Sequence, residues 1–279
     1  MALFLTVLIL SYLYHGLGVT VGYHRLLSHR SFKVPLWLEY LIVSGGYLCL
    51  EGSPIFWVTA HRLHHRYSDH AGDPHSPRDG FWHAFFGWML KAKAADTAAI
   101  SKKLCPDVWR DSIYRWLDVG HTDARALLCI FFFVAFRALI FFTLGPTALF
   151  ANLIASVVIF CAPCLVNSVC HLPDHGYQNF DARDNSRNVW WVGLLALGEG
   201  WHNNHHALPH SARHGLKPDE LDVSWMMISV LKALGLASEV RMPQWKHLVI
   251  NQTVLVDQTA VVEEPEVIRA KSMSHFSRN

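Results

Sequence analysis

Histidines are the residues in this chain whose spacing could do chemistry. Nine of its 19 histidines lie in three tight clusters and one single position, each just past an apolar stretch. They are His24 and His29 in HRLLSH, His61, His64 and His65 in HRLHH, His202, His205 and His206 in HNNHH, and His171 in NSVCH. Positions i, i+3 and i+4 of a helix share one face, so the histidines of each HxxHH cluster are expected to project together. Imidazole suits iron, zinc, copper and nickel. Nine imidazoles are more than one ion can bind, so the pattern predicts two metal ions in one pocket.

The composition is that of a membrane protein. Of the 279 residues, 52% are hydrophobic and 16% are charged, and the mean hydropathy is +0.19. These values are too apolar for an ordinary soluble domain. The net charge of +2 and the lack of any basic tract with interleaved aromatic residues exclude a nucleic-acid partner.

Three apolar segments, at about 2–23, 126–144 and 147–170, have roughly the 20 residues that a bilayer-spanning helix needs. A fourth, at about 36–58, contains Glu39, Glu51 and Pro54, and is a weaker span. If the clusters build one site, the chain cannot cross the membrane between the first and the second of them. We therefore expect 36–58 to form an interfacial helix.

Lysine and arginine are dense on the side of the membrane that carries the histidines, and this indicates that the histidines face the cytoplasm. Arg137, inside the second span, has no account from the sequence. The expected fold is an all-α integral membrane protein, with a bundle of transmembrane helices capped by a cytosolic helical domain that holds the histidine-rich site. We assign one domain at 1–256 and a polar C-terminal tail at 257–279.

The strings around the clusters resemble those of the membrane fatty acid desaturases, and more closely the stearoyl (delta-9) acyl-CoA desaturase-like branch. They are GYHRLLSHRSF, FWVTAHRLHHRYSDHAGDPHSPRDGFWHAFFGWM, NSVCH and GEGWHNNHHALPHSARHG, and the similarity covers roughly residues 5 to 245. The resemblance implies a cytosolic di-iron site beneath transmembrane helices, and a narrow tunnel for a saturated acyl chain. It gives the ligand positions to the nine histidines, and it gives Asn167 the place of a residue that holds a metal-bound water.

Two positions near the implied tunnel are predicted to touch the substrate. Trp57 matches a family aromatic residue at the bend of the tunnel, although an interfacial tryptophan anchor explains it equally well. Glu51 replaces the family's usual glutamine there. The family also has an additional helix before the one that carries the first cluster, so we expect either a shortened member or a start codon assigned too late.

Carboxylates close in sequence to the clusters are candidates to orient the histidine rings and to offset the metal charge. They are Asp69, Asp73 and Glu199. Ordinary loop or helix-cap roles account for each of them about as well.

The predicted reaction is the oxygen-dependent desaturation of an acyl-CoA or acyl-lipid, giving a cis double bond, with delta-9 as the expected position. Two iron ions would be the cofactor and dioxygen the co-substrate. The chain has no G-x-G-x-x-G fingerprint and no appended haem domain, so a cytochrome b5- or ferredoxin-type donor with its reductase must supply electrons.

Two other readings compete with desaturation. A membrane di-iron hydroxylase or oxygenase, acting on an alkyl, sterol or carotenoid substrate, begins with the same hydrogen abstraction. A zinc or copper carrier would place its ligands at mid-membrane depth, but only His15 lies well inside a predicted span.

Overall fold

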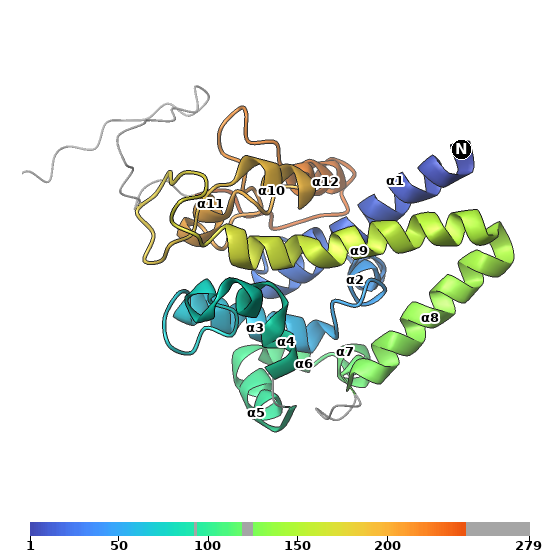
Figure 1. Cartoon of the computed structure of the whole chain (residues 1–279), viewed down its shortest axis with the longest axis horizontal. Coiled ribbons are helices and arrows are strands. Elements are labelled where there is room, and N and C mark those ends of the chain that lie inside the picture. The colour runs from blue at the N-terminus through green and yellow to red at the C-terminus, as the bar shows by residue number, and fades with distance from the viewer. Residues whose placement is uncertain (92–93, 119–124, 244–279) are drawn as a thin grey trace, which may run out of the picture.

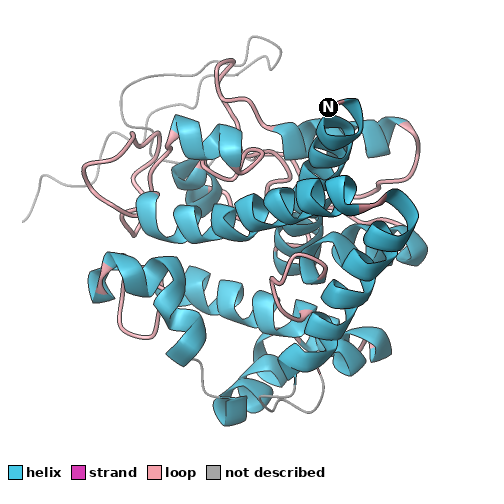
Figure 2. Cartoon of the chain, turned by 45° about the vertical axis from the view of Figure 1, so that its right-hand side comes forward, coloured by secondary structure: helices cyan, strands magenta, loops and turns pink. Residues whose placement is uncertain are grey.

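The structure is a computed structural model that describes residues 1–91, 94–118 and 125–243. These residues form helices joined by loops, with three isolated β-bridges and no strand (Figure 2). The predicted all-α class is confirmed for this part of the chain. The predicted tail at 257–279, and the end of the predicted domain at 244–256, lie outside the described residues.

Within the described ranges, three helices are long and apolar enough to cross a membrane: Ala2–Ser28, Leu127–Leu144 and Pro146–Val169. The first joins α1 (Ala2–Leu17) to the π-helical segment η1 (Gly18–Ser28). The others belong to α8 (Arg125–Leu144) and α9 (Pro146–Val169), which form a hairpin (Figure 1). Gly145 makes the turn at φ 84°, and Pro146 begins the next helix, where its missing N–H costs nothing.

The first long helix continues five residues beyond the predicted end at about residue 23. Every residue of η1 is buried, so the helix runs from the apolar span straight into the protein interior. His24 therefore lies on the continuation of a membrane-length helix, and His29 is its C-cap. This continuity fixes the first histidine cluster relative to the spans.

The prediction of one continuous interfacial helix at 36–58 is wrong, because two helices cover this region. Helix α2 is Leu36–Tyr47 and α3 is Pro54–Tyr67. Leu50 and Gly52 have positive φ values of 69° and 80°, which a helix cannot contain. Ser53 then caps α3 by accepting a hydrogen bond from the Phe56 backbone N–H at 3.1 Å. The break allows α3 to carry the second histidine cluster toward the first.

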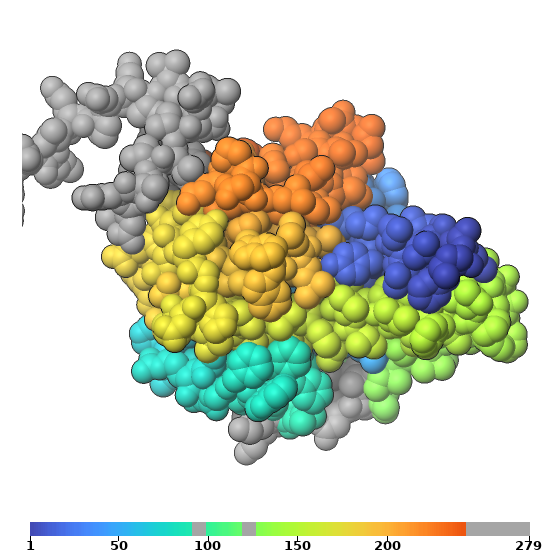
Figure 3. Space-filling view, turned by 45° about the horizontal axis from the view of Figure 1, so that its top comes forward, coloured from blue at the N-terminus to red at the C-terminus, as the bar shows by residue number. Residues whose placement is uncertain are grey.

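Shorter helices surround these elements. They are α4 (Trp88–Lys91), α5 (Ala94–Leu104), α6 (Pro106–Trp109), α7 (Ser112–Leu117), α10 (Trp190–Leu195), α11 (His202–Ala207) and α12 (Val223–Ala233), with η2 (Pro77–Asp79) and η3 (His83–Gly87). Figure 3 shows α1 beside the α8–α9 hairpin, with the C-terminal elements of the described chain along the same face.

Glycines allow the first long helix and α2 to touch backbone to backbone. A Cβ on Gly18 would lie 2.5 Å from the Gly45 Cα, closer than real contacts allow. Small residues at a helix interface permit this approach, and a side chain would separate the helices. The contact holds α2 against the segment that leads to His24.

Arg137, which the sequence left unexplained, joins three elements. It lies on α8, and its guanidinium donates to the Leu48 carbonyl at the end of α2 and to the Ser156 Oγ of α9 at 2.5 Å. Its Cζ lies 3.7 Å from the centre of the Phe133 ring. The buried cation thus ties α8 to the turn between α2 and α3.

Candidate metal centre

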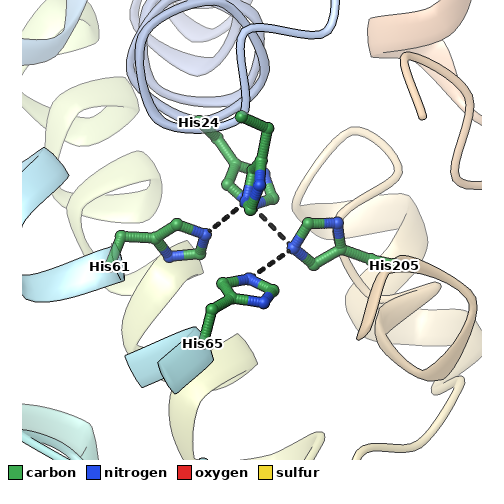
Figure 4. A group of neighbouring side chains, drawn as sticks. His24, His61, His65 and His205 are labelled. Atoms are coloured by element: carbon green, nitrogen blue, oxygen red, sulfur yellow. Dashed lines mark hydrogen bonds between the residues drawn. The ribbon is translucent and has the colours of Figure 1, made fainter. Parts of the chain in front are cut away.

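The nine clustered histidines converge from four separate parts of the chain into two adjacent groups. Within each group the candidate ligand atoms all lie within 4.8 Å of one another. The first group has five members: His24, His29, His61, His65 and His205. The second has four: His64, His171, His202 and His206. Figure 4 shows part of the first group, with the rings pointing toward a common centre.

The Nε2 atoms are the ones that face each other. They are 3.1 Å apart between His24 and His205, and 2.8 Å apart between His205 and His65. In the second group His202 and His171 approach to 3.0 Å. The opposite ring nitrogen, Nδ1, is thereby left to contact the surrounding protein.

Each HxxHH cluster contributes to both groups, which its spacing did not indicate. On α3, His61 and His65 lie one turn apart and join the first group, whereas His64 joins the second. On α11, His205 joins the first group, and His202 and His206 join the second. The two helices therefore lie across the pair of groups and hold them side by side.

Carboxylates contact the Nδ1 atoms of four of these rings. Glu199 lies 2.6 Å from His24, and Asp73 lies 3.0 Å from His64. Asp69 lies 2.9 Å from His171, and Asp184 lies 2.6 Å from His206. A carboxylate that accepts from Nδ1–H fixes the tautomer and leaves Nε2 free to bind a metal. Three of these four carboxylates serve the second group.

The sequence analysis named three of the four carboxylates and missed Asp184. The three that it named were chosen because they are close in sequence to a cluster. Asp184 lies in the loop before α10, 22 positions from the ring that it contacts. Only the folding of this loop over α11 brings the two together, so no local signal marked it.

The carboxylates are themselves held in place. The Asp73 side chain accepts the backbone N–H groups of Asp69 at 2.9 Å and His75 at 3.2 Å. Glu199 pairs at 3.0 Å with Arg25, a fully buried arginine that also pairs with Asp222. Burial raises the pKa of these acids, but the neighbouring histidines and Arg25 lower it by more than burial raises it. The net effect is a lowered pKa for Asp73 and Glu199.

Most of the clustered histidine rings are buried, and several of them have a lowered pKa. Burial, followed by the nearby histidines, holds the pKa of His61, His65, His202 and His205 well below the usual value. Burial lowers the pKa of His206 to about 4, although Asp184 opposes this shift. Neutral imidazole is the form that binds metal, so these five rings need no deprotonation near pH 7.

An apolar cavity borders both groups. Its lining includes His24 and His61 of the first group and His202 of the second, together with Asn167 of α9. The rest of the lining is mostly apolar and includes Ile159, Val166 and Leu197. Asn167 therefore lines the same cavity as these rings.

Trp57 and Glu51 lie beside this cavity but differ in how they reach it. Trp57 lines the cavity and stacks on the His61 ring, with 5.0 Å between ring centres. Its Nε1–H donates to the Glu51 Oε2 at 3.1 Å. Glu51 is buried behind the tryptophan rather than in the cavity lining, and burial raises its pKa to about 8.

His214 is a further buried residue at the site, outside the nine clustered histidines. Its Nδ1 lies 3.0 Å from the Glu199 Oε2, the same oxygen that faces His24. Its ring centre lies 4.5 Å from that of His205. Glu199 is thus shared between a clustered histidine and one outside the clusters.

The donor set fits two iron ions. Each group offers enough imidazole nitrogens for one ion, and no thiol belongs to either group. Imidazole is a good ligand for iron, and the oriented Nδ1 atoms match the usual surroundings of metal-bound histidine. The adjoining cavity leaves one side of both groups open to an apolar ligand.

Comparison with known proteins agrees with this geometry. Residues 1–220 match the family model for fatty acid desaturase. The chain is 40% identical over 243 residues to an sn-1 stearoyl-lipid 9-desaturase of Anabaena variabilis, covering 86% of this chain and 84% of the relative. It is 43% identical over 238 residues to an sn-2 palmitoyl-lipid 9-desaturase of Nostoc sp. (strain 36), covering 83% and 79%. It is also 40% identical over 233 residues to an acyl-CoA 5-desaturase of Anemone leveillei, covering 82% and 69%.

Proposed function

This chain belongs to the fatty acid desaturase family, and from that premise we propose that it uses two iron ions to introduce a cis double bond at carbon 9 of a saturated acyl chain. The observation that carries the proposal is the gathering of five and four histidines into adjacent groups beside one apolar cavity. An unactivated methylene cannot be deprotonated by a side chain, so a metal-based oxidant is required.

The bound irons would supply the oxidising power that cleaves dioxygen and removes hydrogen. The nine histidines would hold them through Nε2, and Asn167 would orient a water at the second group. Asp69, Asp73, Asp184 and Glu199 keep the Nδ1 protons in place. Apolar walls around the cavity exclude bulk water and hold the acyl chain next to the rings.

Trp57 and Glu51 support one wall of this cavity. The indole is stacked on His61 and its N–H is bound by Glu51, so its orientation is fixed from both sides. We infer that the indole face sets where the acyl chain passes the histidines. Its position next to His61 gives Trp57 a role in selecting the carbon that reacts.

An acyl group on a membrane lipid is the substrate that we favour. Two of the similar proteins described above are named as lipid 9-desaturases, and one as an acyl-CoA desaturase. The three helices of membrane length would place the cavity next to the bilayer. Acyl-CoA is the alternative, and the experiment below separates the two.

The chain is proposed to cross the membrane with α1, α8 and α9 and to hold its histidines on the cytoplasmic side, in one domain over 1–256. The short helices α3 to α7 and α10 to α12 would form the cytosolic cap. Electrons would come from a cytochrome b5- or ferredoxin-type protein with its reductase.

Lipid analysis of cells that express the chain tests the proposal. Wild type is expected to produce cis-monounsaturated chains, whose bond position follows from mass spectrometry after derivatisation. His202→Ala is expected to abolish them, while His175→Ala, a change at an exposed histidine outside both groups, is expected to leave them unchanged. Hydroxylated products, or unchanged products in His202→Ala, would contradict the proposal.

A labelling experiment determines whether the substrate acyl chain is carried by a lipid or by coenzyme A. Membranes that contain the enzyme and its electron donor receive either a radiolabelled saturated phospholipid or glycolipid, or radiolabelled stearoyl-CoA with acyl transfer blocked. Label in unsaturated lipid supports the acyl-lipid assignment. Label in unsaturated acyl-CoA alone would replace it with the acyl-CoA alternative.

A further inference from the structure

Two hollows reach the histidines, and they touch different rings. The apolar cavity is lined by His24, His61 and His202. A second hollow, of about 1330 Å³ and open to solvent, is lined by His29 and His65 of the first group and by His206 of the second. The two share no lining residue. The centre therefore has one apolar approach and one polar approach.

The second hollow is strongly basic. Five arginine and lysine residues line it, and we call this surface the basic basin: Arg30, Arg62, Lys103, Arg110 and Arg241. They come from the segment after η1, from α3, from α5, from the residue after α6 and from the end of the described chain. Asp107 is the single carboxylate in the described lining.

Most of this positive charge is not neutralised within the protein. Arg62 binds Asp107 through two hydrogen bonds of 2.7 and 2.8 Å and also donates to backbone carbonyls, so it is a structural residue. Lys103, Arg110 and Arg241 are exposed, and no ion pair involves them in the described part of the chain. The basin thus presents unpaired cations around the rings of His29, His65 and His206.

We propose that the basic basin is the docking surface for a small acidic protein that carries one electron at a time. This inference rests on the proposed function, because desaturation needs a reductant that delivers electrons to the metal centre. Opposite charge steers such carriers and can raise association rates by about 10 to 1000-fold. A carrier bound in this basin would lie next to His29 and His65, two rings of the first group.

A protein fits the basin better than the headgroup of the substrate does. A headgroup stays bonded to the acyl chain, so it must lie at the mouth of the apolar cavity. The basin has no lining residue in common with that cavity. Its cations also lie on several elements around a wide opening, which matches an extended protein surface better than one phosphate.

The electron count follows from the overall reaction. Each docked carrier is oxidised by one electron, so two carriers serve each double bond. Those two electrons and two protons, with the two hydrogens removed from adjacent methylenes, reduce one dioxygen to two waters. The carriers on the docking surface supply the two electrons, and the acyl chain in the apolar cavity supplies the two hydrogens.

Charge reversal in the basin tests the proposal. The variants are Lys103→Glu, Arg110→Glu, Arg241→Glu and the triple variant, in full-length enzyme in nanodiscs. Lys232→Glu on α12, an exposed lysine outside the basin, is the matched control. The probes are an oxidised plant-type [2Fe–2S] ferredoxin and the soluble domain of cytochrome b5, each titrated to give a Kd at low and high salt. Iron content and melting temperature confirm that each variant is folded.

The Kd is compared for whichever carrier supports turnover. At low salt, each single reversal is expected to raise this Kd about twofold to fivefold, and the triple variant at least about tenfold. High salt should shrink the difference, and Lys232→Glu should behave as wild type. Unchanged Kd values in a folded, active triple variant would overturn the docking proposal alone. A raised KM for the lipid with an unchanged carrier Kd would assign the basin to the headgroup instead. Failure of wild type to make unsaturated chains with either carrier would remove the proposed function itself.

Discussion

Removal of one carboxylate should weaken the binding of one of the two metal ions and leave the binding of the other unchanged. Asp184 binds the His206 Nδ1 at 2.6 Å, and its other neighbouring clustered ring is His171; both rings belong to the group of four. Loss of a carboxylate behind a metal-bound histidine typically costs about 10 to 100-fold in metal affinity, or about 1.4 to 2.7 kcal/mol. Asn keeps an acceptor and loses the charge, so Asp184→Asn is expected near the lower value and Asp184→Ala near the upper.

The assay is a competition with a chelator. Enzyme loaded with iron is equilibrated with increasing chelator, and the iron that remains on the protein is measured. Wild type sets the reference range of free chelator concentration over which both ions are lost. Asp184→Asn should release one ion per chain at about tenfold lower free chelator. Asp181→Asn, the same charge change at an exposed residue of the same loop, is the control. Loss of both ions in parallel, or a release curve identical to that of wild type, would refute the separation into two groups.

Three further predictions concern positions outside the metal groups. The pKa of Glu51, about 8 against an ordinary 4.5, means that the folded state binds the extra proton, so stability should fall as pH rises from about 4.5 to about 8. Glu51→Gln should remove this loss, roughly 3 kcal/mol by pH 7, and its melting temperature should rise above that of wild type increasingly from pH 5 to 8; parallel pH curves would contradict it. Gly18→Ala forces a Cβ to within 2.5 Å of the Gly45 backbone and should cost about 1–3 kcal/mol, seen as a melting temperature several degrees lower, and an unchanged value would show that the helices can separate freely. Arg137→Met leaves the Leu48 carbonyl and the Ser156 hydroxyl without their donor and should cost about 1–3 kcal/mol by the same measurement, with Lys232→Met as a control that should not move it.

The sequence was sufficient for the elements and for the type of chemistry. Apolar runs of membrane length predicted the three long helices, and the structure has them. The spacing of the histidines predicted a two-metal pocket, and the described residues contain two adjacent groups that use all nine. Both predictions depend on local regularities, since helix periodicity and span length are properties of short segments.

Other features depended on contacts between distant segments. The break between α2 and α3 depends on the positive φ values of Leu50 and Gly52, which the sequence analysis did not predict. The role of Arg137 required the end of α2 to lie against α8. Neither contact can be read from the residues beside it in the chain.

The division of the histidines into five and four shows the same limit most clearly. HxxHH fixes which rings share a helix face, but the partner of each ring comes from another helix, as with His24 and His205, which are 181 positions apart. Asp184 reaches His206 only through the path of its loop. The residue types in the chain therefore set which ligands are available, and the packing of η1, α3, α9 and α11 assigns each ligand to its ion, because coordination depends on distances between nitrogen atoms and not on separation along the chain.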